Sequence, residues 1–110
     1  DENFVEAEDF YQQLMDKKEE PFAFRAYGLL AQLYAGREYW DAAFKIYQQL
    51  FLEYAETSFF TPPIAETVLR SMNTIGVSKI KDLPRLISVY QRFIEKYPRS
   101  SDYSYRSRDS

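Results

Sequence analysis

One phrase occurs three times in this chain, and the repetition constrains the fold more than any other feature of the sequence. The segments FYQQLMDKKEE, IYQQLFLEYAET and VYQRFIEKYPRS share a tyrosine, at Tyr11, Tyr47 and Tyr90. Successive tyrosines are roughly 40 residues apart, a period that is typical of repeats built from two helices. In such repeats no pair buries its apolar side alone, and each pair stacks on the next. We therefore predict an all-α fold, a right-handed α-solenoid of antiparallel helix pairs.

Apolar periodicity and turn residues divide the chain into about five helices. Apolar side chains recur at intervals of three and four residues, which is the pattern of a helix with one buried side. Pro21 stops the first helix, Pro62 fits the first position of the fourth, and Asp82 fits the cap of the fifth. Residues 1–98 are expected to form one helical repeat domain, and the polar residues 99–110 a flexible tail. The expected helices span residues 3–17, 22–35, 39–55, 62–75 and 83–97.

The residue types that are absent exclude most enzyme chemistries. The chain contains no Cys and no His, so the usual nucleophile, the usual general base and the usual soft metal ligands are missing. The remaining carboxylates, lysines and hydroxyl groups occur without a Gly-rich phosphate loop. We therefore expect no catalytic residue, no cofactor and no metal site, and a protein that is not an enzyme.

The central part of the chain resembles a known repeat family. The segment AYGLLAQLYAGREYWDAAFKIYQQLFLEYAE, within residues 24–57, looks like one tetratricopeptide repeat. Residues 64–75 and 86–98 look like a degenerate repeat, and residues 3–15 look like the second helix of another. Glu38 stands where the family usually has a turn glycine. The positions that carry the resemblance are Tyr27, Leu30, Ala31, Tyr34, Trp40, Ala43 and Tyr47.

The resemblance implies both a fold and a role. Tetratricopeptide repeats stack into α-solenoids and act as non-enzymatic scaffolds for protein–protein interaction or as subunits of complexes. The expected partner is a protein: a peptide or helix held in a groove, or a neighbouring subunit of a larger assembly. The first expected helix lacks a mate and the last lacks a solvating helix. This favours a segment of a longer array, or a subunit whose uncapped ends permit oligomers.

The concave side of such a solenoid is lined by the first helix of each repeat, here the second and fourth expected helices. Gly28 lies inside the second helix, where a small residue would let another helix approach closely. Chaperone-docking members of the family clamp a carboxylate with a Lys, Asn and Arg set that Gly28 and Gln32 do not match. The residues expected to bind a partner are Arg25, Gly28, Leu29, Gln32, Ala35, Arg70, Asn73 and Thr74. The aromatic residues expected to be exposed at an interface are Trp40, Phe59 and Phe60.

The charge pattern leaves one alternative open, a helical repeat that binds RNA as pentatricopeptide proteins do. Residues 61–110 hold nine basic and five acidic side chains, and these cations could contact phosphates. Residues 1–20 hold eight acidic and two basic side chains, and the whole chain has a net charge of −3. An acidic chain lacks the basic footprint that is usual for RNA binders, so a protein partner is the stronger prediction.

Two features of the sequence bear on location. No stretch reaches the roughly 18 apolar residues of a membrane span, and no signal peptide opens the chain, so a soluble protein is expected. The ending YQRFIEKYPRS, residues 90–100, is similar to repeats of tetratricopeptide proteins in the bacterial cell envelope. This similarity implies the same compartment.

Overall fold

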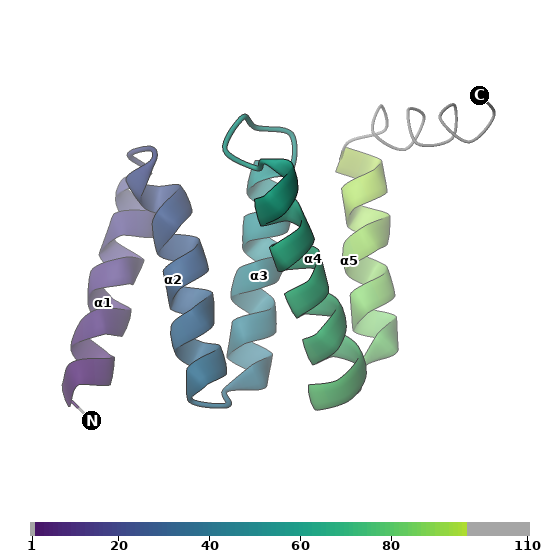
Figure 1. The fold of residues 1–110 in the computed structure, drawn as a ribbon, viewed down its shortest axis with the longest axis horizontal. Helices are drawn as coiled ribbons and strands as arrows, with labels where there is room; N and C mark the ends of the chain where they lie inside the picture. The colour runs from purple at the N-terminus through teal and green to yellow at the C-terminus, as the bar shows by residue number, and fades with distance from the viewer. Residues whose placement is uncertain (1, 97–110) are drawn as a thin grey trace.

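Five α-helices follow one another along residues 2–96, the part of the chain that the computed structural model describes (Figure 1). A π-helical turn, η1, continues the fourth helix, and no strand occurs in this part of the chain. The all-α prediction is therefore confirmed for these residues. The elements are α1 (Glu2–Lys17), α2 (Phe22–Gly36), α3 (Trp40–Tyr54), α4 (Pro62–Thr74), η1 (Ile75–Lys79) and α5 (Leu83–Lys96).

The observed helices begin and end within one residue of the expected bounds. The one addition is η1, which lies where the sequence indicated a break. Asp82 caps α5 as expected, because its Oδ1 accepts a hydrogen bond of 3.1 Å from the backbone N–H of Arg85. Residue 97 of the fifth helix and the expected tail at 99–110 lie outside the described residues.

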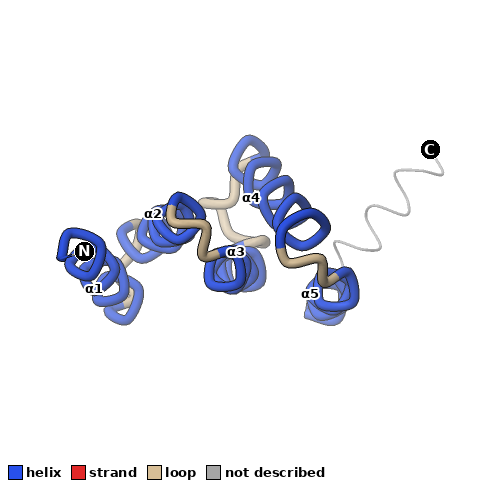
Figure 2. The backbone as a smooth tube through the Cα atoms, turned by 90° about the horizontal axis from the view of Figure 1, so that it is seen from below, coloured by secondary structure: helices blue, strands red, loops and turns tan. Residues whose placement is uncertain are grey.

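The helices are arranged in two rows (Figure 2). Seen end-on, α1, α3 and α5 lie in one row and α2 and α4 in the other, so that the chain alternates between the rows. Each helix runs antiparallel to the one before it, and the three helices of the first row therefore point in the same direction (Figure 1). Packing follows the same order: α2 packs against α1 and α3, and α3 also contacts α4 and α5.

The core is centred on α3, which has more buried side chains than any other described helix. Small residues contribute to the core on two adjacent helices: Ala26 and Ala31 of α2 and Ala43 of α3 are all fully buried. Of the repeated tyrosines, Tyr47 is buried, while Tyr11 and Tyr90 pack partly buried against the same core. The largest fully buried side chains are Phe44, Leu30, Met72 and Val89.

Three elements are followed by a residue in the left-handed conformation that ordinarily favours glycine. Lys18, Glu38 and Lys81 have φ angles of 56°, 61° and 51° and follow α1, α2 and η1. At such a helix end the left-handed residue redirects the chain while the last carbonyls still find donors. After α2, for example, the backbone N–H groups of Glu38 and Tyr39 donate to the carbonyls of Ala35 and Tyr34.

Candidate binding groove

A groove of about 320 Å³ runs between α2 and α4 and has α3 as its floor. It forms because α2 and α4 are neighbours in one row while α3 lies below them in the other (Figure 2). Four lining residues come from α2, two from α3 and four from α4. They are Phe24, Arg25, Gly28, Gln32, Tyr47, Leu50, Pro63, Ile64, Thr67 and Val68.

The floor and both inner walls of the groove are apolar. Tyr47, Leu50 and Val68 are buried beneath it, and Phe24 and Ile64 are partly buried on its two sides. No residue deep in this groove offers a charged group. Such a surface suits an apolar side chain of a ligand, because contact would remove apolar area from water on both partners.

The rim on the α2 side is polar. Arg25 and Gln32 are exposed, and among the described residues neither has a hydrogen-bond or ion-pair partner. On the α4 side, the Thr67 hydroxyl already donates to the carbonyl oxygen of Pro63, at 3.0 Å. The free guanidinium and amide therefore lie along one edge of an apolar channel.

Gly28 opens the groove toward the backbone of α2. A Cβ atom built at Gly28 would meet nothing within 4 Å, and its φ angle is not in the left-handed region. The expectation that Gly28 lets another helix approach closely is therefore wrong. Neither packing nor backbone conformation requires glycine here, although glycine inside a helix costs about 1 kcal/mol relative to alanine.

The structure brings together three of the eight residues that were expected to bind a partner: Arg25, Gly28 and Gln32. Leu29 also lies on α2 and is 45% exposed, but it does not line the groove. Ala35 is partly buried and packs against the core. The three residues share the α2 face that turns toward α4.

The three expected residues of α4 do not line the groove. Arg70 pairs with Glu66 one turn earlier on the same helix, and Thr74 is exposed at the helix end. Asn73 faces α5, because its Oδ1 accepts a hydrogen bond of 2.6 Å from the Tyr90 hydroxyl. The groove instead uses the first two turns of α4, which the sequence analysis missed.

The aromatic residues expected to be exposed are only partly so. Phe59 stacks on Phe24 with ring centroids 5.5 Å apart, and Phe60 lies 6.2 Å from the ring of Phe51. The Lys79 ammonium lies 5.1 Å from the centre of the Trp40 ring. All three expected rings pack against the core. Phe59 and Phe60 are covered because the insert after α3 folds back over the helices, whereas Trp40 lies in the first turn of α3.

A hydrogen-bonded pair holds the start of α2 beside the groove. The Glu20 carboxylate accepts one hydrogen bond from the backbone N–H of Phe24, at 3.0 Å, and another from the Tyr54 hydroxyl. Burial raises the pKa of Tyr54 above its ordinary value, and the hydrogen bond to Glu20 raises it further by a smaller amount. The Tyr54 ring also contacts the Phe24 ring, with centroids 5.0 Å apart, so this pair positions one wall of the groove.

Within residues 2–96, no group of three or more His, Cys, Asp or Glu side chains is placed to hold a metal ion. Among the helices of this range, none combines the length and apolarity needed to cross a membrane.

Comparison of the chain with protein-family models, with curated proteins and with solved structures finds no match.

Proposed function

We propose that this chain is a tetratricopeptide-like α-solenoid that binds a protein partner and has no enzymatic activity. The alternation of the helices between two rows supports this proposal, as does the return of the repeated tyrosine in α1, α3 and α5, the helices of one row. In an array of this kind the other row, here α2 and α4, presents the ligand-binding surface.

The groove between α2 and α4 is the observation that carries the proposal. Its apolar floor accepts one or two apolar side chains of an extended peptide or a helix, and its rim provides hydrogen-bonding groups. The unpaired guanidinium of Arg25 favours a ligand with a carboxylate next to the apolar anchor, because the two opposite charges attract. Specificity then comes from the spacing of anchor and carboxylate.

An assembly role receives support from an exposed apolar face of α5. Leu83, Ile87 and Ile94 are between 46% and 54% exposed and lie on one face of the helix. An apolar face of this kind is what a further helix would cover in a longer array, or a neighbouring subunit in a complex.

The test is a selection of peptides from a random phage-displayed library on the full chain, followed by titration of the selected peptides. G28W should abolish their binding, because an indole at residue 28 fills the groove. G36W is the matched control, since Gly36 also lies on α2 in open space but outside the groove. Peptides that bind G28W as tightly as the wild type would argue against this groove as the binding site.

A further inference from the structure

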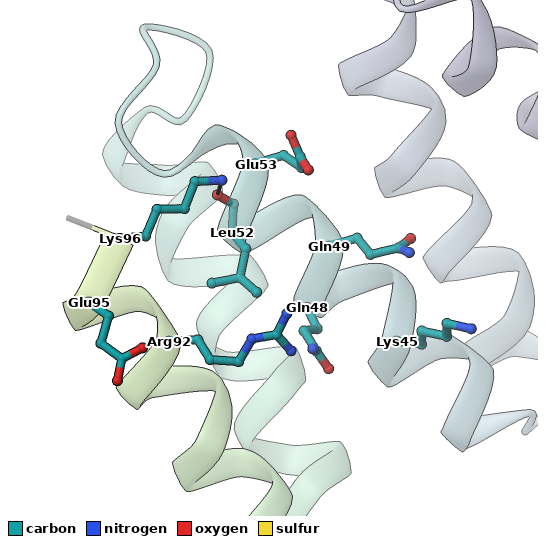
Figure 3. A pocket seen from close by; sticks show the side chains of 8 residues that line it. All are labelled: Lys45, Gln48, Gln49, Leu52, Glu53, Arg92, Glu95 and Lys96. Atoms are coloured by element: carbon teal, nitrogen blue, oxygen red, sulfur yellow. Dashed lines mark hydrogen bonds between the residues drawn. The ribbon is translucent and has the colours of Figure 1, made fainter.

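A second groove lies on the opposite side of the molecule, between α3 and α5 of the three-helix row (Figure 3). It consists of two hollows of about 620 and 410 Å³, which adjoin because both are lined by Lys45, Gln48 and Arg92. Figure 3 shows that Arg92 extends from α5 toward Gln48 of α3, with Leu52 beside it. We call this surface the α3–α5 groove.

One end of the α3–α5 groove is positive. Lys45 lines it from the second turn of α3, Arg85 lines it from the first turn of α5, and Arg92 lines it from two turns further along α5. Arg85 is paired with Asp41. Lys45 and Arg92 have no ion-pair or hydrogen-bond partner within residues 2–96. Two uncompensated cations therefore face solvent on neighbouring helices.

The other end of the α3–α5 groove carries both signs of charge. Glu53 and Glu95 line it near the last turns of the helices. Lys96 lies there too, but its ammonium donates to the backbone carbonyl of Leu52 at 2.8 Å. The groove thus changes from a positive stretch to one of mixed charge in the direction in which α3 and α5 run.

The exposed side of α1 carries the opposite charge to this positive end. Four exposed carboxylates follow one another at intervals of four, three and seven residues: Glu2, Glu6, Asp9 and Asp16. These intervals place them in one line along the helix. Lys17 stands at the C-terminal end of this line. We call these four carboxylates the acidic ridge. It is about 21 Å long, and the stretch of α3 that lines the groove, residues 41–53, is about 18 Å long.

We propose that the α3–α5 groove binds the acidic ridge of a second copy of this chain. With the second α1 parallel to α3, Glu6 and Asp9 come opposite Lys45 and Arg92. Complementary charges on two surfaces select the partner more than they add affinity.

The arrangement of the row allows both copies to bind at once. The helices α1, α3 and α5 lie in one row and point in the same direction (Figures 1 and 2). A two-fold axis parallel to these helices therefore brings the three-helix row of one copy face to face with the three-helix row of the other. The acidic ridge of each copy then lies over the α3–α5 groove of the other. The contact is isologous, so the product is a closed dimer rather than an open chain. The groove between α2 and α4 stays accessible.

Charge reversal on the full chain tests the proposal by size-exclusion chromatography with light scattering. At about 0.05 M salt the wild type should form dimers, and at about 1 M salt these should dissociate, because screening shortens the range of exposed charges. The groove variant K45E/R92E and the ridge variant E6K/D9K should each be monomeric, with affinity reduced about 100-fold or more. A mixture of the two should form heterodimers, because both contacts are then between opposite charges.

Two controls keep the test decisive. R25E reverses a charge on the other row and should leave dimerisation unchanged. The variant that combines all four reversals should recover the homodimer, which excludes misfolding as the cause of the monomeric variants. A monomeric wild type at low salt, a dimer that survives either reversal, or a mixture that stays monomeric would each overturn the proposal. Peptide binding by the α2–α4 groove is measured separately, so the two proposals can fail independently.

Discussion

Gly76 of η1 lies against the ring of Phe44 in α3: a Cβ atom added at Gly76 would lie 3.3 Å from Cε2 of Phe44 and 3.4 Å from Cβ of Leu86. Both neighbours are buried, at 0% and 5% exposed, so neither can move aside freely. We expect G76A to lower the free energy of unfolding by about 1–3 kcal/mol, the usual cost of overfilling a packed core. Urea denaturation followed by circular dichroism measures this change.

The same substitution at Gly28 should have the opposite effect. Nothing lies within 4 Å of a Cβ atom there, so G28A adds helix propensity without a clash. We expect a gain of about 0.5–1 kcal/mol in the free energy of unfolding. A loss of stability in G28A would contradict the open space at Gly28, and a gain in G76A would contradict the packing described for η1.

Phe59 tests whether the insert between α3 and α4 contributes to the core. Because its ring stacks on Phe24 and contacts Tyr54, we expect F59A to cost about 1–3 kcal/mol of unfolding free energy. Phe22 provides the control, since its side chain is 52% exposed and F22A should change stability much less. Equal denaturation midpoints for F59A and the wild type would mean that the ring is not packed.

Glu38 occupies a left-handed conformation that costs a non-glycine residue about 1–2 kcal/mol. We expect E38G to raise the free energy of unfolding by up to about 1 kcal/mol, because glycine adopts this conformation without strain but loses more entropy on folding. E38A retains a Cβ atom and should show no such gain. A thermal unfolding series of the three proteins distinguishes the effect of the backbone from that of the lost carboxylate.

The raised pKa of Tyr34 makes the free energy of unfolding depend on pH in the alkaline range. Burial, followed by its hydrogen bond of 2.5 Å to Glu8, raises the pKa of Tyr34 from 10.0 to about 12. The unfolded chain therefore loses this proton at lower pH than the folded chain, so the stabilisation is complete below pH 10 and is lost as the pH rises toward 12. Between these values Y34F should lose stability less steeply with pH than the wild type. Parallel slopes for the two proteins would exclude this linkage.

The helices could be predicted from sequence because their ends depend on local signals. Pro21 cannot continue α1, and the Asp82 side chain satisfies a backbone N–H of the first turn of α5 whatever lies nearby. The exception is η1, a π-helical turn that continues α4 and packs against α3 and α5. No local pattern in residues 75–79 indicates this turn, because it depends on a contact between distant elements.

The groove could be predicted only on its α2 side. Which face of α4 meets α2 depends on the rotation of α4 about its axis, and that rotation is fixed by Val68 and Met72 entering the core. The periodicity of α4 alone does not place Thr67 in the groove and Asn73 toward α5. The sequence alone also does not show which glycine is needed for close packing. Only the packing of the folded chain distinguishes the open position of Gly28 from the crowded position of Gly76.

The order of packing along the chain also shapes how this protein reaches its folded state. Most contacts between helices join elements that are consecutive in sequence, which keeps the contact order low. Chains of this kind form their structure rapidly and need no long loop closure before the first stable unit appears. The α2–α3 hairpin has the most extensive pairing and is a natural nucleus. Backbone amides of α2 and α3 should accordingly resist hydrogen exchange longest, while α1 opens first because its extensive packing is on α2 alone.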